Sequence, residues 1–574
     1  MASKRKKNQK EDTKNLRICA ISCESLMSRI FSYLDVKLKL RLSQASKAWH
    51  ESLKVSTSWG VLNLLPVPCC FAKYPAVGKA TCLYYEVTVS DRETLLERLS
   101  NLENLEEFEI CFEFSETWHE FFDTYTVMKA LQAVKTSKMR HLLLDTTGFA
   151  VGTADLRRLA EILIGCSALQ SLSLTVSLMM PFGGTHDTLW EAIGALLSLN
   201  RLEIRVESWT PGLAIMENIQ LSQLARCVAM EFLSMRLPSH AFEIQGDRNL
   251  DKALRNMPCL KQLELELYGN LTENLFQYLA TIFDNSKLHA LEELSLAFPA
   301  VNDDDLWVVN EWNVFLGSMT ASNLPKLKEL RFLIHNTNVE RSCYANFGAM
   351  LVSLPIQVLV LDLKKSVWRN ASLEALLMSI GSMRQLTDLE LQLQDNNLLS
   401  DASSEAWMTL ASLENLESFK INISQCIDLR SYSLMKLFKA TARCAKLHTL
   451  HLTMTKVAVA PQASSALANA IRGLSKLQDV LLSMTSCCLT DESAKSLAKA
   501  LRVAPALCCL EMHMEDNMIH VSGAKSLLNA LRATPRLKIF RWKMFEGNDF
   551  SEGDVEAVSK ITAKMQAFKQ YEVE

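Results

Sequence analysis

The chain of 574 residues lacks long apolar runs and an apolar leader. No stretch of about 18 consecutive apolar residues occurs, and no apolar segment follows the start Met-Ala-Ser-Lys4-Arg5-Lys6-Lys7. We therefore expect an intracellular, cytoplasmic protein, and the basic start is also compatible with nuclear import. The net charge of only −3 gives no overall drive toward nucleic acid or an anionic membrane, so neither is expected as a partner.

Motifs of catalysis and of metal binding are also absent. The sequence has no GxxxxGK[ST] phosphate loop, no GxSxG nucleophile elbow and no HExxH helix. Its 16 cysteines include three doublets, but none has the paired spacing of a zinc site, and scattered cysteines behave as small apolar residues in a reducing compartment. His451 and His513 fall on strand positions and are expected to be surface residues. We expect no enzymatic activity, no metal and no other cofactor.

What the chain does contain is a phrase that recurs about every 30 residues: one apolar residue, two polar residues, then Leu-x-Leu alternation. The clearest copies begin at Leu386, Leu416, Leu447, Leu477, Leu507 and Leu537. Less regular copies begin at Leu105, Met139, Leu169, Leu199, Leu260, Leu291, Leu327 and Ile356, with a weaker copy at Cys227-Val-Ala-Met230-Glu-Phe232. A fixed period of this size indicates a solenoid of about fifteen repeats, each consisting of strand, turn, helix and turn.

The segments between the strands have helical spacing. In residues 493–501 and 522–531 the apolar positions lie three or four apart, which predicts a helix in each repeat. Val555, Val558, Ile561, Met565 and Phe568 continue this spacing and predict a terminal helix that caps the stack.

The chain divides by composition into four predicted parts. Residues 1–15 are expected to form a disordered basic tail, and residues 16–60 a small helical module. Residues 61–100 contain three prolines and a strand-like segment, which predicts a junction that caps the first repeat. Residues 101–574 hold the repeats and the capping helix.

The recurring phrase resembles that of the leucine-rich repeat family, within it the longer class seen in ribonuclease inhibitor and the Ran GTPase-activating protein. The resemblance implies an α/β solenoid shaped as a horseshoe, with a parallel sheet inside and helices outside. The units are slightly longer than usual, and the extension falls at the strand end. The Asn that often follows the strand in this family is present at Asn517 and Asn397 but missing from many copies, so we expect the turn geometry to vary.

Residues 24–49 resemble the F-box, the module that docks a substrate receptor onto a cullin-RING ubiquitin ligase. The resemblance implies that the adaptor is contacted by Leu26, Ile30, Phe31, Leu34, Leu42 and Trp49. The Leu-Pro pair that usually opens the motif is Ser22-Cys23 here, so the proline that would start the first helix is missing. The alternative is that these residues only cap the first repeat.

The side chains of the concave face follow from strand alternation. Residues just before and after the second leucine of each phrase should point into the groove. The candidate target-binding residues are Glu203, Glu264, Glu266, Glu293, Glu329, Arg331, Asp362, Asp388, Glu390, Arg541 and Lys543. The excess of acidic residues favours a basic or mixed-charge protein segment, and a merely solvated surface is an equal alternative.

Together these features predict a substrate-recognition subunit of a cullin-RING (SCF-type) ubiquitin ligase. Its expected partners are the ligase adaptor with its cullin complex and a protein substrate. The alternatives are a leucine-rich-repeat scaffold without a ligase link and a GTPase-activating or inhibitor-type protein. No repeat carries a recognisable residue for positioning a transferring phosphate, which weakens the GTPase-activating alternative.

Overall fold

A computed structural model describes most of the chain beyond residue 138. The described residues are 61–64, 82–86, 107–111, 128, 131–132, 138–178, 187–208, 221–239, 250–269, 273–286, 288–298, 309–335, 341–365, 370–396 and 404–566. The chain divides into two compact units, Met1–Leu260 and Lys261–Glu574, called here the N-terminal and C-terminal units. The predicted tail 1–15 and helical module 16–60 lie outside the described residues, and the predicted boundaries 61–100 and 101–574 stay predictions.

The N-terminal unit contains parallel strands that pair in chain order from β1 to β7. The strands are β1 (Val61–Leu64), β2 (Cys82–Glu86), β3 (Glu107–Cys111), β4 (His141–Val151), β5 (Ser171–Leu178), β6 (Arg201–Ser208) and β7 (Phe232–Pro238). Its described helices are α7 (Thr153–Ile164), α8 (Asp187–Gly194), the 3-10 helix η5 (Leu221–Arg226) and α9 (Leu250–Arg255). Strands β1 and β2 come from the predicted junction and continue the parallel pairing of the repeats.

The C-terminal unit repeats the same alternation more regularly, and its strands also pair in parallel and in chain order. The strands are β8 (Gln262–Tyr268), β9 (Glu293–Phe298), β10 (Glu329–Ile334), β11 (Val358–Asp362), β12 (Asp388–Gln392), β13 (Ser418–Asn422), β14 (Thr449–Thr453), β15 (Asp479–Ser483), β16 (Cys509–His513) and β17 (Ile539–Lys543). The helices are α10 (Glu273–Ser286), α11 (Val309–Ser318), α12 (Arg341–Ser353), α13 (Asn370–Ser382), α14 (Ser404–Trp407), η8 (Met408–Ser412), α15 (Ser431–Thr441), α16 (Pro461–Gly473), α17 (Asp491–Arg502), α18 (Val521–Ala533) and α19 (Glu552–Gln566).

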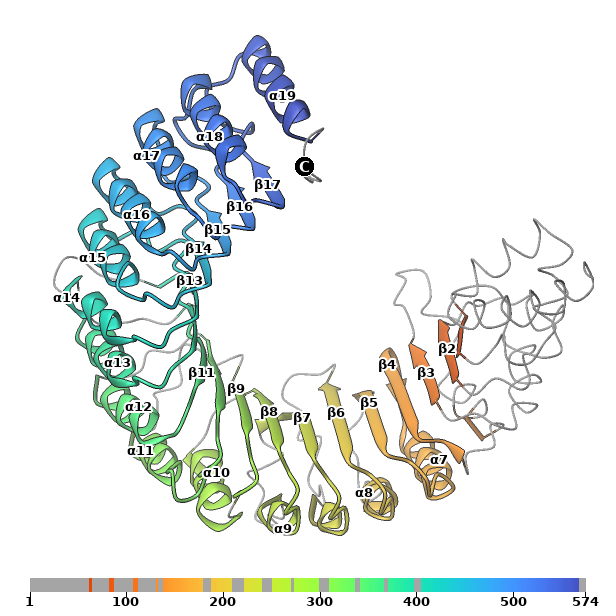
Figure 1. Ribbon diagram of the computed structural model, residues 1–574. Coiled ribbons are helices and arrows are strands. Elements are labelled where there is room, and N and C mark those ends of the chain that lie inside the picture. Colours follow the sequence, from red (N-terminus) through yellow and green to blue (C-terminus); the bar gives the residue numbers. More distant parts are fainter. Residues whose placement is uncertain are drawn as a thin grey trace, which may run out of the picture. The chain divides into compact units, whose positions relative to one another are not determined.

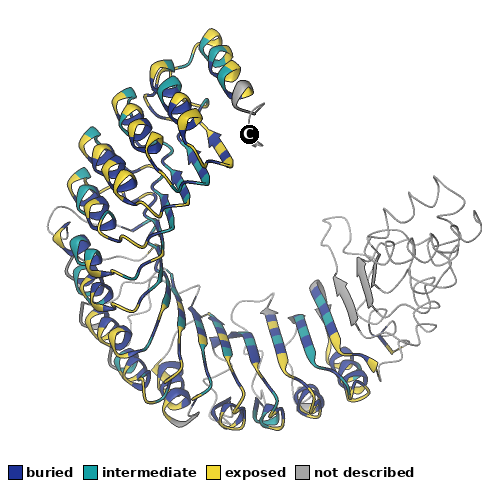
Figure 2. Cartoon of the chain, viewed as in Figure 1, coloured by how far each residue is buried: buried dark blue, intermediate teal, exposed yellow. Residues whose placement is uncertain are grey.

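Within the C-terminal unit the helices lie along one side of the sheet, and we call the other side the helix-free face (Figure 1). Strand residues alternate between the two sides: Leu389 and Leu391 are buried against the helices, whereas Asp388, Glu390 and Gln392 are only partly buried. Within this unit, buried residues line the space between strands and helices in one repeat after another (Figure 2), and most of them are apolar. The fold is therefore α/β, with parallel strands alternating with helices, and is consistent with a solenoid.

The register of the strands confirms the phrase in most repeats and corrects it in one. Leu202 of β6 pairs with Leu233 of β7, not with Met230. The phrase of this repeat therefore runs from Met230 to Met235, three residues later than predicted. Met230, Leu233 and Met235 are each at most 1% exposed, as the three apolar positions of the phrase require.

The predicted variation in turn geometry is wrong for the regular repeats. After each strand from β11 to β16 a non-glycine residue at the same turn position has a positive φ between 53° and 60°, and after β15 Cys488 has a second one of 56°. The residues at the shared turn position are Lys365, Asp395, Gln425, Lys456, Ser486 and Asp516. The backbone N–H of each donates to a carbonyl of the following repeat, as from Asp395 N to Ser424 O at 2.9 Å. This bond helps to offset the cost of the left-handed conformation, about 1–2 kcal/mol per residue.

Asn517, the residue after this turn position, links its own turn to the turn of the preceding repeat. Its Nδ2 donates to Met484 O at 2.8 Å and Met514 O at 3.0 Å, and its Oδ1 accepts from Cys487 N and Leu489 N, both at 2.9 Å. Asn397 lies outside the described residues, and its neighbour Asn396 occupies the equivalent position. In the other repeats from β13 onward the position holds Cys426, Val457, Cys487 and Asn548.

The Asn517 network predicts a large loss of stability on its removal. Asn517→Ala leaves buried carbonyl and N–H groups without partners, and the expected cost is about 3 kcal/mol of unfolding free energy. The measurement is urea unfolding followed by circular dichroism. The control is Asn529→Ala on the exposed side of α18, which should change stability by less than about 0.5 kcal/mol. Equal stability of the two variants would contradict this role of Asn517.

Candidate functional site: the helix-free face

The predicted target-binding residues of the C-terminal unit all lie on the helix-free face. Their burial alternates with that of the apolar residues beside them, as for Glu264 next to Leu263 and Leu265. Glu203 has the same place on β6 of the N-terminal unit, between buried Leu202 and Ile204. The strand alternation therefore predicted their positions correctly, and their role in binding stays a prediction. The six residues predicted to contact the adaptor lie outside the described residues.

Charge is distributed unevenly along the helix-free face of the C-terminal unit. The strands from β8 to β12 place seven acidic side chains on it and one cation, Arg331. The acidic residues are Glu264, Glu266, Glu293, Glu329, Asp362, Asp388 and Glu390. The strands from β13 to β17 carry a balanced set: Lys420, Asp479, Glu511, Arg541 and Lys543. The first half of the face is therefore acidic, and the second half is mixed.

Several of these charges are paired within the face. Arg331 Nε lies 2.5 Å from Glu329 Oε1, and Lys420 Nζ lies 3.9 Å from Glu390 Oε2. These pairs are partly exposed, so each stabilises the fold little. The side chains of Glu264 and Glu293 have no partner among the described residues. Two carboxylates on neighbouring strands are thus available to an incoming cation.

Asp362, at the end of β11, is a largely enclosed charged group of the face. Its Oδ2 lies 3.0 Å from His335 Nε2 and 3.4 Å from Lys364 Nζ. The His335 contact is close but not aligned as a hydrogen bond. Burial acts to raise the pKa of Asp362, but the contact with His335 and the charge of Lys364 outweigh it, so this pKa is held below its usual value.

Sequence analysis missed His335 and Lys364, although a signal for His335 was present. The outward positions of β10 continue from Arg331 through Leu333 to His335, two steps beyond the positions counted. The acidic partners of the two predicted surface histidines were missed as well. His451 Nε2 lies 3.1 Å from Asp479 Oδ2, and His513 Nε2 lies 3.1 Å from Glu511 Oε1.

The cysteines of the described residues are free thiols, and five are buried. Burial raises the pKa of Cys227, Cys444 and Cys487 to about 11, so these thiols stay protonated and unreactive at neutral pH. Across the described residues, no group of three or more His, Cys, Asp or Glu side chains is placed to hold a metal ion. In the same part of the chain, no helix has both the length and the apolar character to cross a membrane.

No family model matches the chain, and no curated protein matches it.

The lowered pKa of Asp362 predicts a pH-dependent contribution to stability. A carboxylate whose pKa is lower in the folded state stabilises the fold above its unfolded pKa of about 3.9, and this contribution is lost as pH falls through the folded pKa. Asp362→Asn should therefore be less stable than the parent chain at pH 7, and the gap should narrow as pH falls below about 3.9. Urea unfolding at pH 7 and at a series of lower pH values measures it. The control Asp428→Asn, at an exposed turn, should have the same unfolding free energy as the parent chain at pH 7. If Asp362→Asn stays less stable than the parent chain at low pH, the charge of Asp362 is not the cause.

Proposed function

We propose that the protein is a substrate-recognition subunit of a cullin-RING (SCF-type) ubiquitin ligase, built on leucine-rich repeats. The N-terminal F-box-like module docks the ligase adaptor, and the helix-free face of the repeats binds the target protein. The chain itself carries out no chemistry. Its contribution is proximity, because holding the target and the ubiquitin-transfer machinery together raises their effective concentration.

The observation that carries the proposal is the order of apolar residues in the N-terminal segment. Leu26, Ile30, Phe31 and Leu34, followed by Leu42 and Trp49, keep the F-box spacing without a gap. A helical module of this size buries too little apolar surface to be stable alone, so its apolar side chains need a partner. The repeats follow this segment in the chain, after the predicted junction 61–100, which is the order of a receptor that joins an adaptor to a target.

The repeats support target binding by their construction. The apolar positions of each strand are used for the core, which leaves the alternate positions free to differ between repeats without loss of packing. The acidic half of the helix-free face, with Glu264 and Glu293 unneutralised, favours a basic segment of the target. Association of such a segment should be fast and sensitive to salt.

The adaptor proposal predicts the result of a pull-down. The full-length chain should recover the ligase adaptor, and Ile30→Asp/Trp49→Ala should recover less than about a tenth as much, because a buried apolar anchor is replaced by a charge. Lys39→Asp/His50→Ala, at positions outside the predicted contact, should recover the adaptor like the parent chain. If none of the three proteins recovers the adaptor, the ligase proposal fails and the interpretation as a scaffold without a ligase link remains. In a separate assay, stimulation of GTP hydrolysis by a small GTPase would support the GTPase-activating alternative.

The acidic half of the helix-free face predicts binding of a basic peptide. A fluorescent Lys/Arg-rich peptide should bind the full chain, and Glu264→Lys/Glu293→Lys should weaken binding on the order of tenfold, because attraction becomes repulsion at two adjacent strands. The control is Glu374→Lys/Glu492→Lys, which makes the same change in net charge on helices. Fluorescence anisotropy at low and physiological salt measures both. Equal weakening by the two variants would indicate an effect of net charge alone.

A further inference from the structure

A second charged surface lies outside the helix-free face. Four consecutive repeats each contain one window that runs from the last turns of a helix to the start of the next strand: residues 439–448, 469–478, 499–508 and 529–538. Together the windows hold ten lysines and arginines and no aspartate or glutamate. We call these cations the basic edge: Lys439, Arg443, Lys446, Arg472, Lys476, Lys499, Arg502, Arg532, Arg536 and Lys538.

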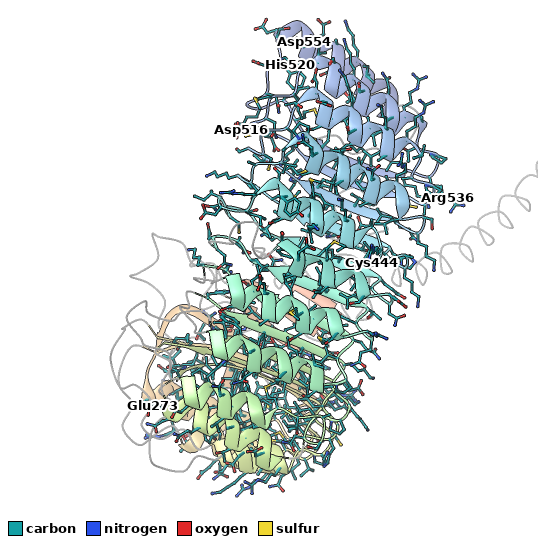
Figure 3. All side chains as sticks on the ribbon, turned by 90° about the vertical axis from the view of Figure 1, so that its left-hand side faces the viewer. Glu273, Cys444, Asp516, His520, Arg536 and Asp554 are labelled. Carbon is teal, nitrogen blue, oxygen red and sulfur yellow. The ribbon has the colours of Figure 1, made fainter. Side chains whose placement is uncertain are left out.

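All ten side chains of the basic edge are exposed. They lie along the edge of the C-terminal unit where the strands begin, between helices α15 to α18 and strands β14 to β17. Figure 3 labels Cys444 and Arg536 along this edge and shows Asp516 and His520 along the opposite one. The basic edge is thus separate from the helix-free face and from the turns with positive φ.

The repeat spacing aligns these cations in rows. Arg472, Arg502 and Arg532 lie in the last turns of α16, α17 and α18 and follow each other at intervals of 30 residues. Lys446, Lys476 and Arg536 form a second set, each one residue before the first leucine of a phrase. Neighbouring strands lie about 5 Å apart and packed helices about 10 Å apart, so each row is a closely spaced line of like charge.

Helix capping explains only part of this charge. A cation in the last turn of a helix interacts favourably with the helix dipole, which accounts for Arg472, Arg502 and Arg532. It does not account for Lys476 and Arg536, which lie in the turns beyond. None of the ten forms an ion pair with the described residues. The donors Lys446 and Arg472 bond only to neutral amides, Asn415 Oδ1 at 2.7 Å and Asn469 Oδ1 at 3.0 Å. Folding alone therefore leaves the charge of this edge uncompensated.

We propose that the basic edge binds an acidic segment of a partner protein. Charge complementarity requires an anionic partner, and the residues between the cations favour a protein. After Arg502 and Arg532 the exposed uncharged side chains of the turns are Val503, Pro505, Ala533 and Pro535. These give apolar contact to a polypeptide but no hydrogen bond to a phosphate. The helices also end at this edge with carbonyl groups, whereas phosphate groups are held by the N–H groups at helix starts.

The net charge of the whole chain gives no sign of the basic edge. A net charge of −3 gives no drive toward an anionic partner. That average holds only because acidic residues elsewhere, including those of the helix-free face, balance the cations of one edge. The inference does not depend on the proposed ligase function, because it concerns a different surface and a partner of opposite charge.

The test uses the full-length chain and two fluorescent probes, a Glu-rich peptide with interspersed Leu and Ala residues and a DNA duplex of similar net charge. Lys476→Glu/Arg536→Glu should weaken peptide binding by at least about tenfold, because two cations of one row become anions. The matched control Lys495→Glu/Lys525→Glu makes the same change in net charge near the starts of α17 and α18. It should stay within about twofold of the parent chain. Glu264→Lys/Glu293→Lys should bind the acidic probe at least as well as the parent chain, which separates this surface from the helix-free face.

Three outcomes would overturn the proposal. Absence of peptide binding at low salt, or equal loss in the edge variant and its control, would show that the cations form no specific surface. Tighter binding of the duplex than of the peptide, lost in the same edge variant, would assign the edge to nucleic acid instead. Thermal unfolding of each variant establishes that the charge reversals leave the fold intact.

Discussion

The fold of the C-terminal unit depends on backbone hydrogen bonds from each repeat to its neighbour. The carbonyl of His448 accepts from both Gln478 N and Asp479 N at the start of the next strand, and the turn after the strand donates in the same regular way, as from Lys456 N to Thr485 O. One repeat alone can satisfy neither these groups nor its apolar face. The fold is therefore stabilised by interactions between repeats, namely backbone hydrogen bonds and the packing of leucines at fixed positions. The outward side chains of the strands and turns are not needed for stacking, and they are the ones that carry the charged surfaces.

The period and the alternation predicted which side of the sheet a residue faces, because both follow from the backbone. Asp388 and Glu390 lie on the helix-free face for the same reason that Leu389 and Leu391 do not. The prediction failed at Cys227, Met230 and Phe232, where the apolar pattern alone fits two registers equally well. The constant spacing between repeats distinguishes them, since Met230 lies 31 residues after Leu199 and 30 before Leu260.

The turns were not predictable from their side chains, because what the repeats share there is a backbone hydrogen bond to the next repeat. Residues as different as Lys365, Gln425 and Ser486 adopt the same positive φ. The Asn-type bridge is likewise replaced by a thiol: Cys426 Sγ contacts Leu393 O at 3.2 Å, where Asn396 in the preceding repeat donates its Nδ2 to Leu363 O. The contact of His335 with Asp362 was missed for a different reason. It joins the ends of two strands 27 residues apart, and only the register of the sheet brings them together.

A repeat protein can present opposite charges on separate surfaces, because each surface takes its residues from one fixed position of the repeat. In the C-terminal unit the acidic residues occupy outward strand positions in β8 to β12, and the cations occupy helix ends and turns in the repeats of α15 to α18. Neighbouring strands lie about 5 Å apart, so the six strand steps from β8 to β14 separate Glu264 from the basic edge by about 30 Å, whereas at physiological salt charges are screened over about 8 Å. A partner at one surface therefore experiences little of the other surface's charge. Overall net charge, which sums the two, is for this reason a poor guide to what such a chain binds.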